Sequence, residues 1–73
     1  MPRLPVLTSK KVIGFLKKNG FVLDHVSGSH YVFFNKINDR RVTVPFHRKD
    51  LPKGTLKSII LQSGLGSERF LEI

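Results

Sequence analysis

The sequence predicts an α+β fold: a two-layer α-β-β-β-α sandwich in which a three-stranded antiparallel sheet carries two helices on one face. Two segments near the ends of the chain have apolar residues at helical spacing. Between them lie three short runs rich in β-branched and aromatic residues, separated by turn-forming residues. Connections this short favour an antiparallel meander. A chain of 73 residues is expected to form one domain spanning 1–73.

The first helix is expected from about Ser9 to Asn19. Thr8 or Ser9 can accept a hydrogen bond from the free amides of the first turn. Gly20 follows the helix as a residue that adopts positive φ without strain. Residues 1–7 contain two prolines and are expected to be extended. The apolar stripe of the helix consists of Val12, Ile13, Phe15 and Leu16.

Three strands are expected over residues 21–26, 30–35 and 41–46, with turns at 27–29 and 38–39. The third strand alternates, so its apolar residues should face the helices; these are Val42, Val44 and Phe46. Pro45 has no amide to donate and should end this strand or lie at a sheet edge. The face of the sheet away from the helices is left to solvent or to a ligand.

The second helix is expected over residues 52–63. Asp50 is a candidate cap, and Pro52 suits the first turn. Gly64 should close the helix, and Ser67 is expected to cap a short final turn that runs to Phe70. The apolar face of the helix consists of Leu56, Ile59 and Ile60.

The chain is strongly basic, with thirteen Lys and Arg against five Asp and Glu and a formal charge of +8. Such an excess attracts polyanions, of which nucleic acid is the first candidate. An anionic membrane surface or an acidic protein is an alternative partner. The sequence has no run of about 18 apolar residues, so no membrane span is expected. Residues 1–7 lack the apolar region of a signal peptide, and the chain has no cysteine, so a cytoplasmic location is expected.

The sequence argues against several kinds of site. The three histidines and five carboxylates are scattered, and no spacing resembles a metal-ligand motif, so neither a metal nor another cofactor is expected. The glycine-rich motifs that bind nucleotides are absent. A serine-based triad is not expected in a chain this small.

His30 follows Gly28-Ser29 at the start of the second expected strand, where a turn fixes its backbone. Histidine can take or give a proton near neutral pH. RNA cleavage without a metal needs a base for the 2′-hydroxyl, an acid for the leaving oxygen, and positive charge near the phosphate. One histidine fills only one proton role at a time. The alternative reading of His30 is a strand-end residue with a structural hydrogen bond.

A second stretch, residues 44–49, leads from the third strand into His47, Arg48 and Lys49. This pattern is typical of a loop that contacts phosphates, although an ordinary solvated loop would look the same. Lys53 opens the second helix, where free amides can bind an anion or can simply be capped.

Four motifs in this order resemble the HicA (YcfA-like) toxin family from Thr8 to about Leu65. They are Lys18-Asn19-Gly20-Phe21, Gly28-Ser29-His30-Tyr31, Val42-Thr43-Val44-Pro45-Phe46-His47 and Gly54-Thr55-Leu56-Lys57-Ser58-Ile59-Ile60. The resemblance implies a double-stranded-RNA-binding-domain-like fold and the toxin of a type II toxin–antitoxin system, an endoribonuclease that cleaves mRNA. It also implies an acidic HicB-type antitoxin as partner, and a monomer is expected for the free toxin. The family's catalytic histidine corresponds to His30, and the expected RNA-binding residues are Ser29, His47, Arg48, Lys49 and Lys53.

Two other functions are consistent with parts of the sequence. A non-catalytic RNA-binding module of the same fold would read RNA shape and 2′-hydroxyls, and it would tolerate Gln or Asn at position 30. A small basic DNA-binding subunit is disfavoured because no helix-turn-helix spacing is present.

Overall fold

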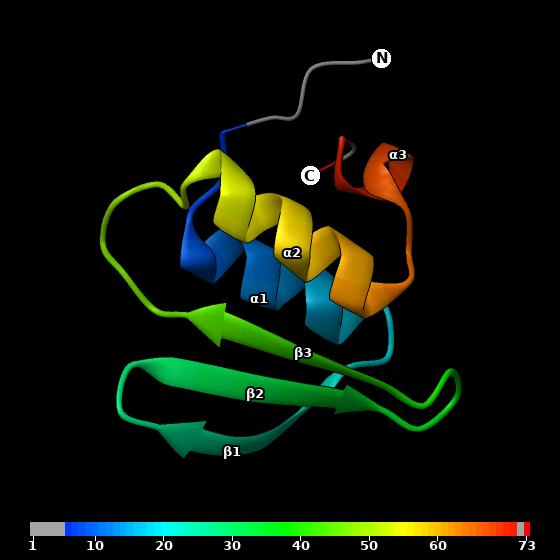
Figure 1. Cartoon of the computed structure of the whole chain (residues 1–73). Coiled ribbons are helices and arrows are strands. Elements are labelled where there is room, and N and C mark those ends of the chain that lie inside the picture. The colour runs from blue at the N-terminus through cyan, green and yellow to red at the C-terminus, as the bar shows by residue number, and fades with distance from the viewer. Residues whose placement is uncertain (1–5, 72) are drawn as a thin grey trace.

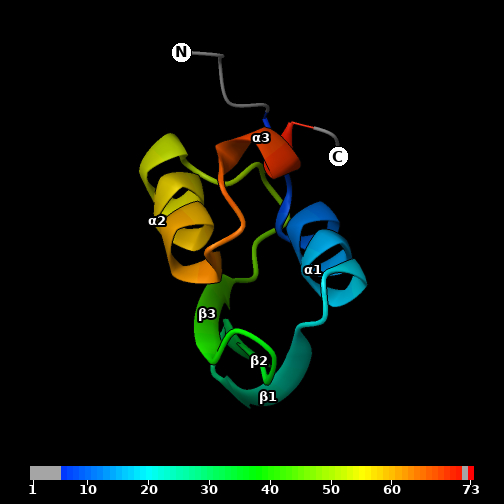
Figure 2. The same ribbon diagram turned by 90° about the vertical axis from the view of Figure 1, so that its right-hand side faces the viewer.

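The computed structural model describes residues 6–71 and 73, and it places two helices side by side on one face of a sheet (Figure 1). The three strands are antiparallel, in the order β1-β2-β3. Seen after a turn of 90°, no described helix covers the opposite face (Figure 2). The predicted α+β sandwich is therefore confirmed. In chain order the elements are α1 (Ser9–Lys18), β1 (Val22–Ser27), β2 (His30–Asn35), β3 (Arg40–Pro45), α2 (Lys53–Ser63) and α3 (Ser67–Phe70).

The core lies between the helices and the side of the sheet that faces them. Apolar side chains at the predicted helical and strand positions fill it, and their removal from water supplies the main driving force for folding. Val42 and Val44 of β3 are fully buried, as their alternation predicts. The helices and β2 contribute Val12, Leu16, Phe33, Leu56, Ile59 and Ile60, all at most 7% exposed.

Phe46 does not continue the buried row of β3. The strand ends at Pro45, and Phe46 is 41% exposed. Its ring packs against Tyr31, with 5.1 Å between the ring centroids. Phe46 was expected to face the helices with Val42 and Val44, and its contact with Tyr31 is on that side, but it is not buried as they are because the chain leaves the sheet at this residue on its way to α2.

The first hairpin is shifted by one residue from the prediction. Phe21 precedes β1 and belongs to the core, whereas Ser27 belongs to the strand and pairs with His30. The turn is therefore only Gly28-Ser29. Gly28 has a φ of 58°, a left-handed conformation that glycine adopts without the steric cost of a Cβ atom.

The helix caps agree with the sequence at α1 and differ at the two later helices. Thr8 caps α1 by accepting a hydrogen bond from the Lys11 amide at 3.3 Å. Asp50 does not cap α2, because the helix begins only at Lys53 and Pro52 occupies the capping position. Ser67 is the first residue of α3 rather than its cap. Of the segment 1–7 that was expected to be extended, residues 1–5 lie outside the described residues.

The two edges of the sheet differ. Along the β3 edge, α2 packs closely, and Gln62 accepts a hydrogen bond from the outward Thr43 amide at 2.9 Å. Pro45 lies two residues further along β3. As a proline it has no backbone N–H group that would need a partner at this edge, as expected there. The β1 edge is uncovered, and the side chains of Val22, Leu23 and Val26 are about half exposed. No helix in the described ranges is long and apolar enough to cross a membrane.

Candidate functional site

His30 lies at one end of the sheet and is the first residue of β2. It pairs with Ser27 of β1 and with Pro45 of β3. Its neighbour Tyr31 packs against the core on the helix side. Because successive strand residues point to opposite faces, His30 points to the face away from the helices, which we call the open face. The residue is exposed there, so its imidazole is available to a ligand.

The loop between β3 and α2, residues 46–52, is anchored at its first end beside His30. The Phe46 amide donates to the Ser29 carbonyl at 2.7 Å. Ser9, fully buried at the start of α1, donates its hydroxyl to the Pro45 carbonyl at 2.7 Å and accepts from the His47 amide at 3.1 Å. The turn before β2 and the start of α1 therefore fix the backbone from Pro45 to His47.

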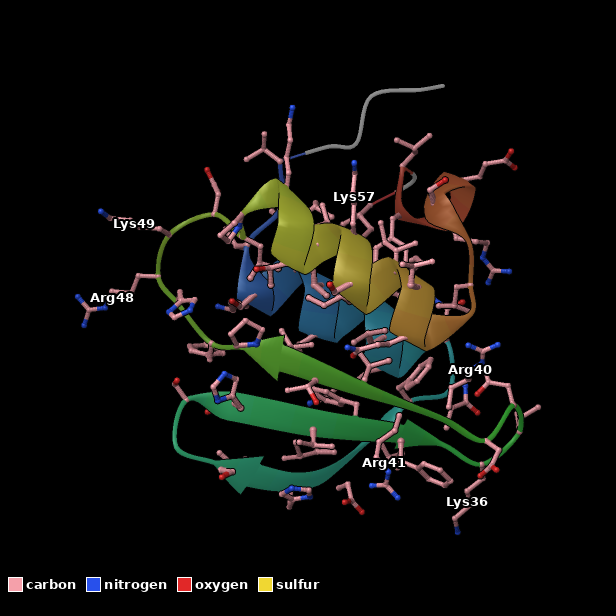
Figure 3. The ribbon with its side chains drawn as sticks, in the orientation of Figure 1. Lys36, Arg40, Arg41, Arg48, Lys49 and Lys57 are labelled. Atoms are coloured by element: carbon pink, nitrogen blue, oxygen red, sulfur yellow. The ribbon has the colours of Figure 1, made fainter. Side chains whose placement is uncertain are left out.

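The second end of this loop is anchored to the residues that precede α1. The Leu51 amide donates to the Leu7 carbonyl at 2.8 Å, and Asp50 forms an antiparallel bridge with Thr8. Between the two anchored ends, Arg48 and Lys49 are exposed and point away from the body of the protein (Figure 3). Cations presented on a fixed backbone are suited to contact phosphates.

The structure brings some of the predicted site residues together at one end of the sheet, and the others lie further along the chain in the adjacent loop and at the start of α2. Backbone pairing places Ser29, His30 and the His47 backbone at the same end of the sheet. Arg48 and Lys49 extend from this end into solvent, and exposed Lys53 opens α2 just after the loop. No described side chain caps the first turn of α2.

Sequence reasoning missed a second group on the open face, formed by Asp24, His25 and Arg41, which we call the open-face cluster. Asp24 Oδ2 lies 2.7 Å from His25 Nδ1 and accepts a hydrogen bond from Arg41 Nη1 at 3.0 Å. Arg41 sits opposite Phe34, with its guanidinium 4.9 Å from the ring centroid. Its side chain points away from the helices (Figure 3). The cluster thus links β1 to β3 across the intervening β2.

A β-bulge makes this cluster possible. The pairing of β1 with β2 shifts between Leu23 and His25, so Asp24 is the extra residue in β1. In a regular strand Asp24 and His25 would point to opposite faces, but a bulge lets two consecutive side chains oppose one partner residue. Strict alternation would place the two side chains on opposite faces, so the pair was not predicted. Its only sign in the sequence is that an acid and a histidine are adjacent.

The electrostatics of the open-face cluster keep its carboxylate ionised. The hydrogen bond with His25 and the positive charge of Arg41 hold the pKa of the Asp24 carboxyl below its usual value. Asp24 is therefore negatively charged at every pH at which an imidazole titrates. The cluster thus combines an ionised acid, a histidine and a fixed cation on one surface.

The described residues contain another cationic surface and no metal-ligand cluster. A shallow groove between α1 and α3 is lined in part by Lys11, Lys18 and Arg69. It lies on the helical layer, whereas His30 lies on the open face. Within residues 6–71 and 73, no group of three or more His, Cys, Asp or Glu could hold a metal ion.

The chain matches a known protein family. The family model described as the HicA toxin of bacterial toxin-antitoxin matches residues 9–65. No curated protein matches the chain. The matched range runs from the first residue of α1 through α2 and includes His30, the anchored loop and the open-face cluster. Because the match covers most of the 73 residues, the chain belongs to the HicA toxin family of bacterial toxin–antitoxin systems.

Proposed function

We propose that this toxin is a metal-independent endoribonuclease that cleaves mRNA and thereby inhibits translation in the cytoplasm. His30 is the proposed catalytic residue. The proposed RNA contacts come from the same end of the sheet and consist of Ser29, His47, Arg48, Lys49 and Lys53. The protein is proposed to act as one domain and, when free, as a monomer.

The main observation that supports this proposal is the pairing of His30 with Pro45, two residues before His47. Through this pairing, an exposed imidazole lies beside a loop whose backbone is fixed by Ser9 and Ser29 and which presents Arg48 and Lys49. A catalytic group held on rigid structure beside cations costs little reorganisation when the substrate binds. The formal charge of +8 further favours capture of RNA.

The proposed reaction uses a nucleophile from the RNA itself. A base removes the proton of a 2′-hydroxyl, O2′ bonds to the adjacent phosphorus, and the bond from phosphorus to O5′ breaks. An acid protonates the leaving 5′-oxygen. The products are a 2′,3′-cyclic phosphate and a 5′-hydroxyl. Arg and Lys side chains stabilise the negative charge that develops on the phosphate oxygens.

The test compares purified wild type with His30→Ala and His30→Gln on a labelled RNA. Both variants should lose cleavage by about a hundredfold or more while they keep RNA affinity and folding, because the proton-transfer group is lost and the cationic surface remains. EDTA should not slow the wild type. A folded His30→Ala protein that cleaves at the wild-type rate would refute the role of His30, and RNA binding without cleavage by the wild type would favour the non-catalytic module.

The proposed partner is an acidic antitoxin of the HicB type. Opposite charge would steer it to a +8 toxin and raise the association rate. It should cover His30 and residues 47–49, so that it competes directly with RNA. The complex should therefore cleave and bind RNA far less than the free toxin. A complex with full nuclease activity, or one that leaves His30 accessible to solvent, would contradict this mode of inhibition.

A further inference from the structure

RNA cleavage of the proposed kind needs two proton transfers. One group accepts the proton of the 2′-hydroxyl, and a different group gives a proton to the leaving 5′-oxygen. His30 fills only one of these roles in a single step. A second proton-transfer group must therefore reach the same phosphate, and it must do so from the open face or from the end of the sheet where His30 lies.

The register of the sheet places His25 near His30. His25 pairs with Val32, and Ser27 pairs with His30, so the two histidines are diagonal neighbours on adjacent strands. Directly paired residues of antiparallel strands share a face, so both side chains belong to the open face. Diagonal neighbours are separated by about 7–8 Å, which leaves room for a phosphate between two imidazoles.

The open-face cluster fixes the orientation of the His25 ring. With Nδ1 held 2.7 Å from the Asp24 carboxylate, the ring donates its Nδ1 proton and leaves Nε2 as the free nitrogen. Arg41 holds the same carboxylate from β3. The His25 side chain is still 55% exposed, so a ligand on the open face can approach it.

We infer that His25 is the general acid of the proposed RNA cleavage and that Asp24 is its positioning residue. The inference rests on the proposed function and adds the second proton-transfer group to it. His30 takes the 2′-hydroxyl proton as O2′ bonds to phosphorus. As the bond to O5′ breaks, protonated His25 gives its Nε2 proton to that oxygen. The ionised Asp24 suits His25 to proton transfer, since a carboxylate on Nδ1 orients the ring and leaves Nε2 as the nitrogen that carries the transferred proton.

The inference predicts a particular dependence on pH. The groups that surround His25 on the open face are Asp24 on its own strand, His30 on β2 and Arg41 on β3. A mechanism with one base and one acid gives a bell-shaped profile of kcat/KM against pH, in which the limb at high pH reports the acid. A variant without His25 should therefore lack that limb.

The first experiment measures kcat/KM against pH for wild type, His25→Ala and Asp24→Asn. His25→Ala should lose about a hundredfold at the optimum and should lack the descending limb at high pH. Asp24→Asn should lose less, and mainly in kcat, because it keeps the His25 imidazole and removes only the carboxylate that orients the ring. The matched control is Asp39→Asn, which removes the same charge from the exposed turn between β2 and β3 and should leave the profile unchanged. RNA affinity should stay within twofold in His25→Ala, since the ring is exposed and its loss leaves no cavity.

The second experiment uses an RNA with sulfur in place of the bridging 5′-oxygen. A thiolate leaves without a proton, so His25→Ala should cleave this RNA almost as fast as wild type, whereas His30→Ala should stay inactive. A His25→Ala protein that is equally slow on both RNAs would overturn the acid role. If His25→Ala cleaves ordinary RNA at the wild-type rate while His30→Ala does not, the inference fails and the proposed function stands. If wild type cleaves neither RNA, both fail.

Discussion

The two faces of the sheet are built from the same three strands but differ in almost every physical property. Over β2 and β3 the face under the helices is closed and mostly apolar, and Phe33, Val42 and Val44 are at most 1% exposed. The open face carries His25, His30 and Arg41 in contact with solvent. One face therefore stabilises the fold, while the other is free to carry titratable and cationic groups because these groups do not have to be desolvated.

The largest expected difference concerns two adjacent phenylalanines on opposite faces. Phe33→Ala should lower the free energy of unfolding by about 3–5 kcal/mol, because it leaves a cavity in the core. Phe34→Ala should cost about 1–2 kcal/mol, since Phe34 is only partly buried and its removal opens no closed cavity. Urea denaturation of both variants measures the two changes in the free energy of unfolding. An equal loss in the two proteins would mean that the open face contributes to stability as much as the core does.

A smaller effect is expected at the anchor between α1 and the loop. Ser9→Ala removes the hydroxyl that bonds Pro45 and His47, so it should cost about 1–3 kcal/mol and weaken RNA binding as the loop loosens. Ser58→Ala is the matched control, because Ser58 is exposed on α2. Denaturation and RNA titration of both variants test this. If Ser9→Ala lowers stability while RNA affinity stays intact, the anchored loop would lie outside the RNA interface.

The smallest effect concerns the salt dependence of RNA binding. Each contact between a cation and a phosphate releases counterions, so Arg48→Ala and Lys49→Ala should each reduce the log–log salt slope by about 0.7–0.9. Lys36→Ala, at the far end of the sheet, is the matched control and should leave the slope unchanged (Figure 3). The slope is measured from affinities at several salt concentrations. Unchanged slopes in both loop variants would remove Arg48 and Lys49 from the interface.

The sequence predicted the closed face well and the open face only in part. Alternation in β3 and helical spacing in α1 and α2 predicted which residues are buried, since both patterns are local. Phe46 broke the alternation because the chain leaves the sheet there. His30 was identified as a candidate from its position after a turn. Its proximity to residues 46–49 depends on the register of the strands, which could not be predicted from the sequence.

The open-face cluster could not be predicted from the sequence, for a different reason. Asp24 and His25 share a face only because one extra residue bulges out of β1, and the sequence does not mark where a bulge falls. Arg41 joins them through a partner that lies 17 positions away along the chain. Ser9 was missed for a similar reason, because its buried hydroxyl bonds residues more than 30 positions away along the chain.

The most direct test of the proposed function is to determine which surface of the protein RNA occupies. The measurement follows the backbone amide NMR signals of His30→Ala during titration with a 2′-O-methyl RNA, which has no free 2′-hydroxyl to attack the phosphate. The largest shifts are expected in residues 25–32 and 41–49, on the open face and at the end of the sheet that carries the anchored loop. Shifts concentrated instead around Lys11, Lys18 and Arg69, in the groove between α1 and α3, would contradict it.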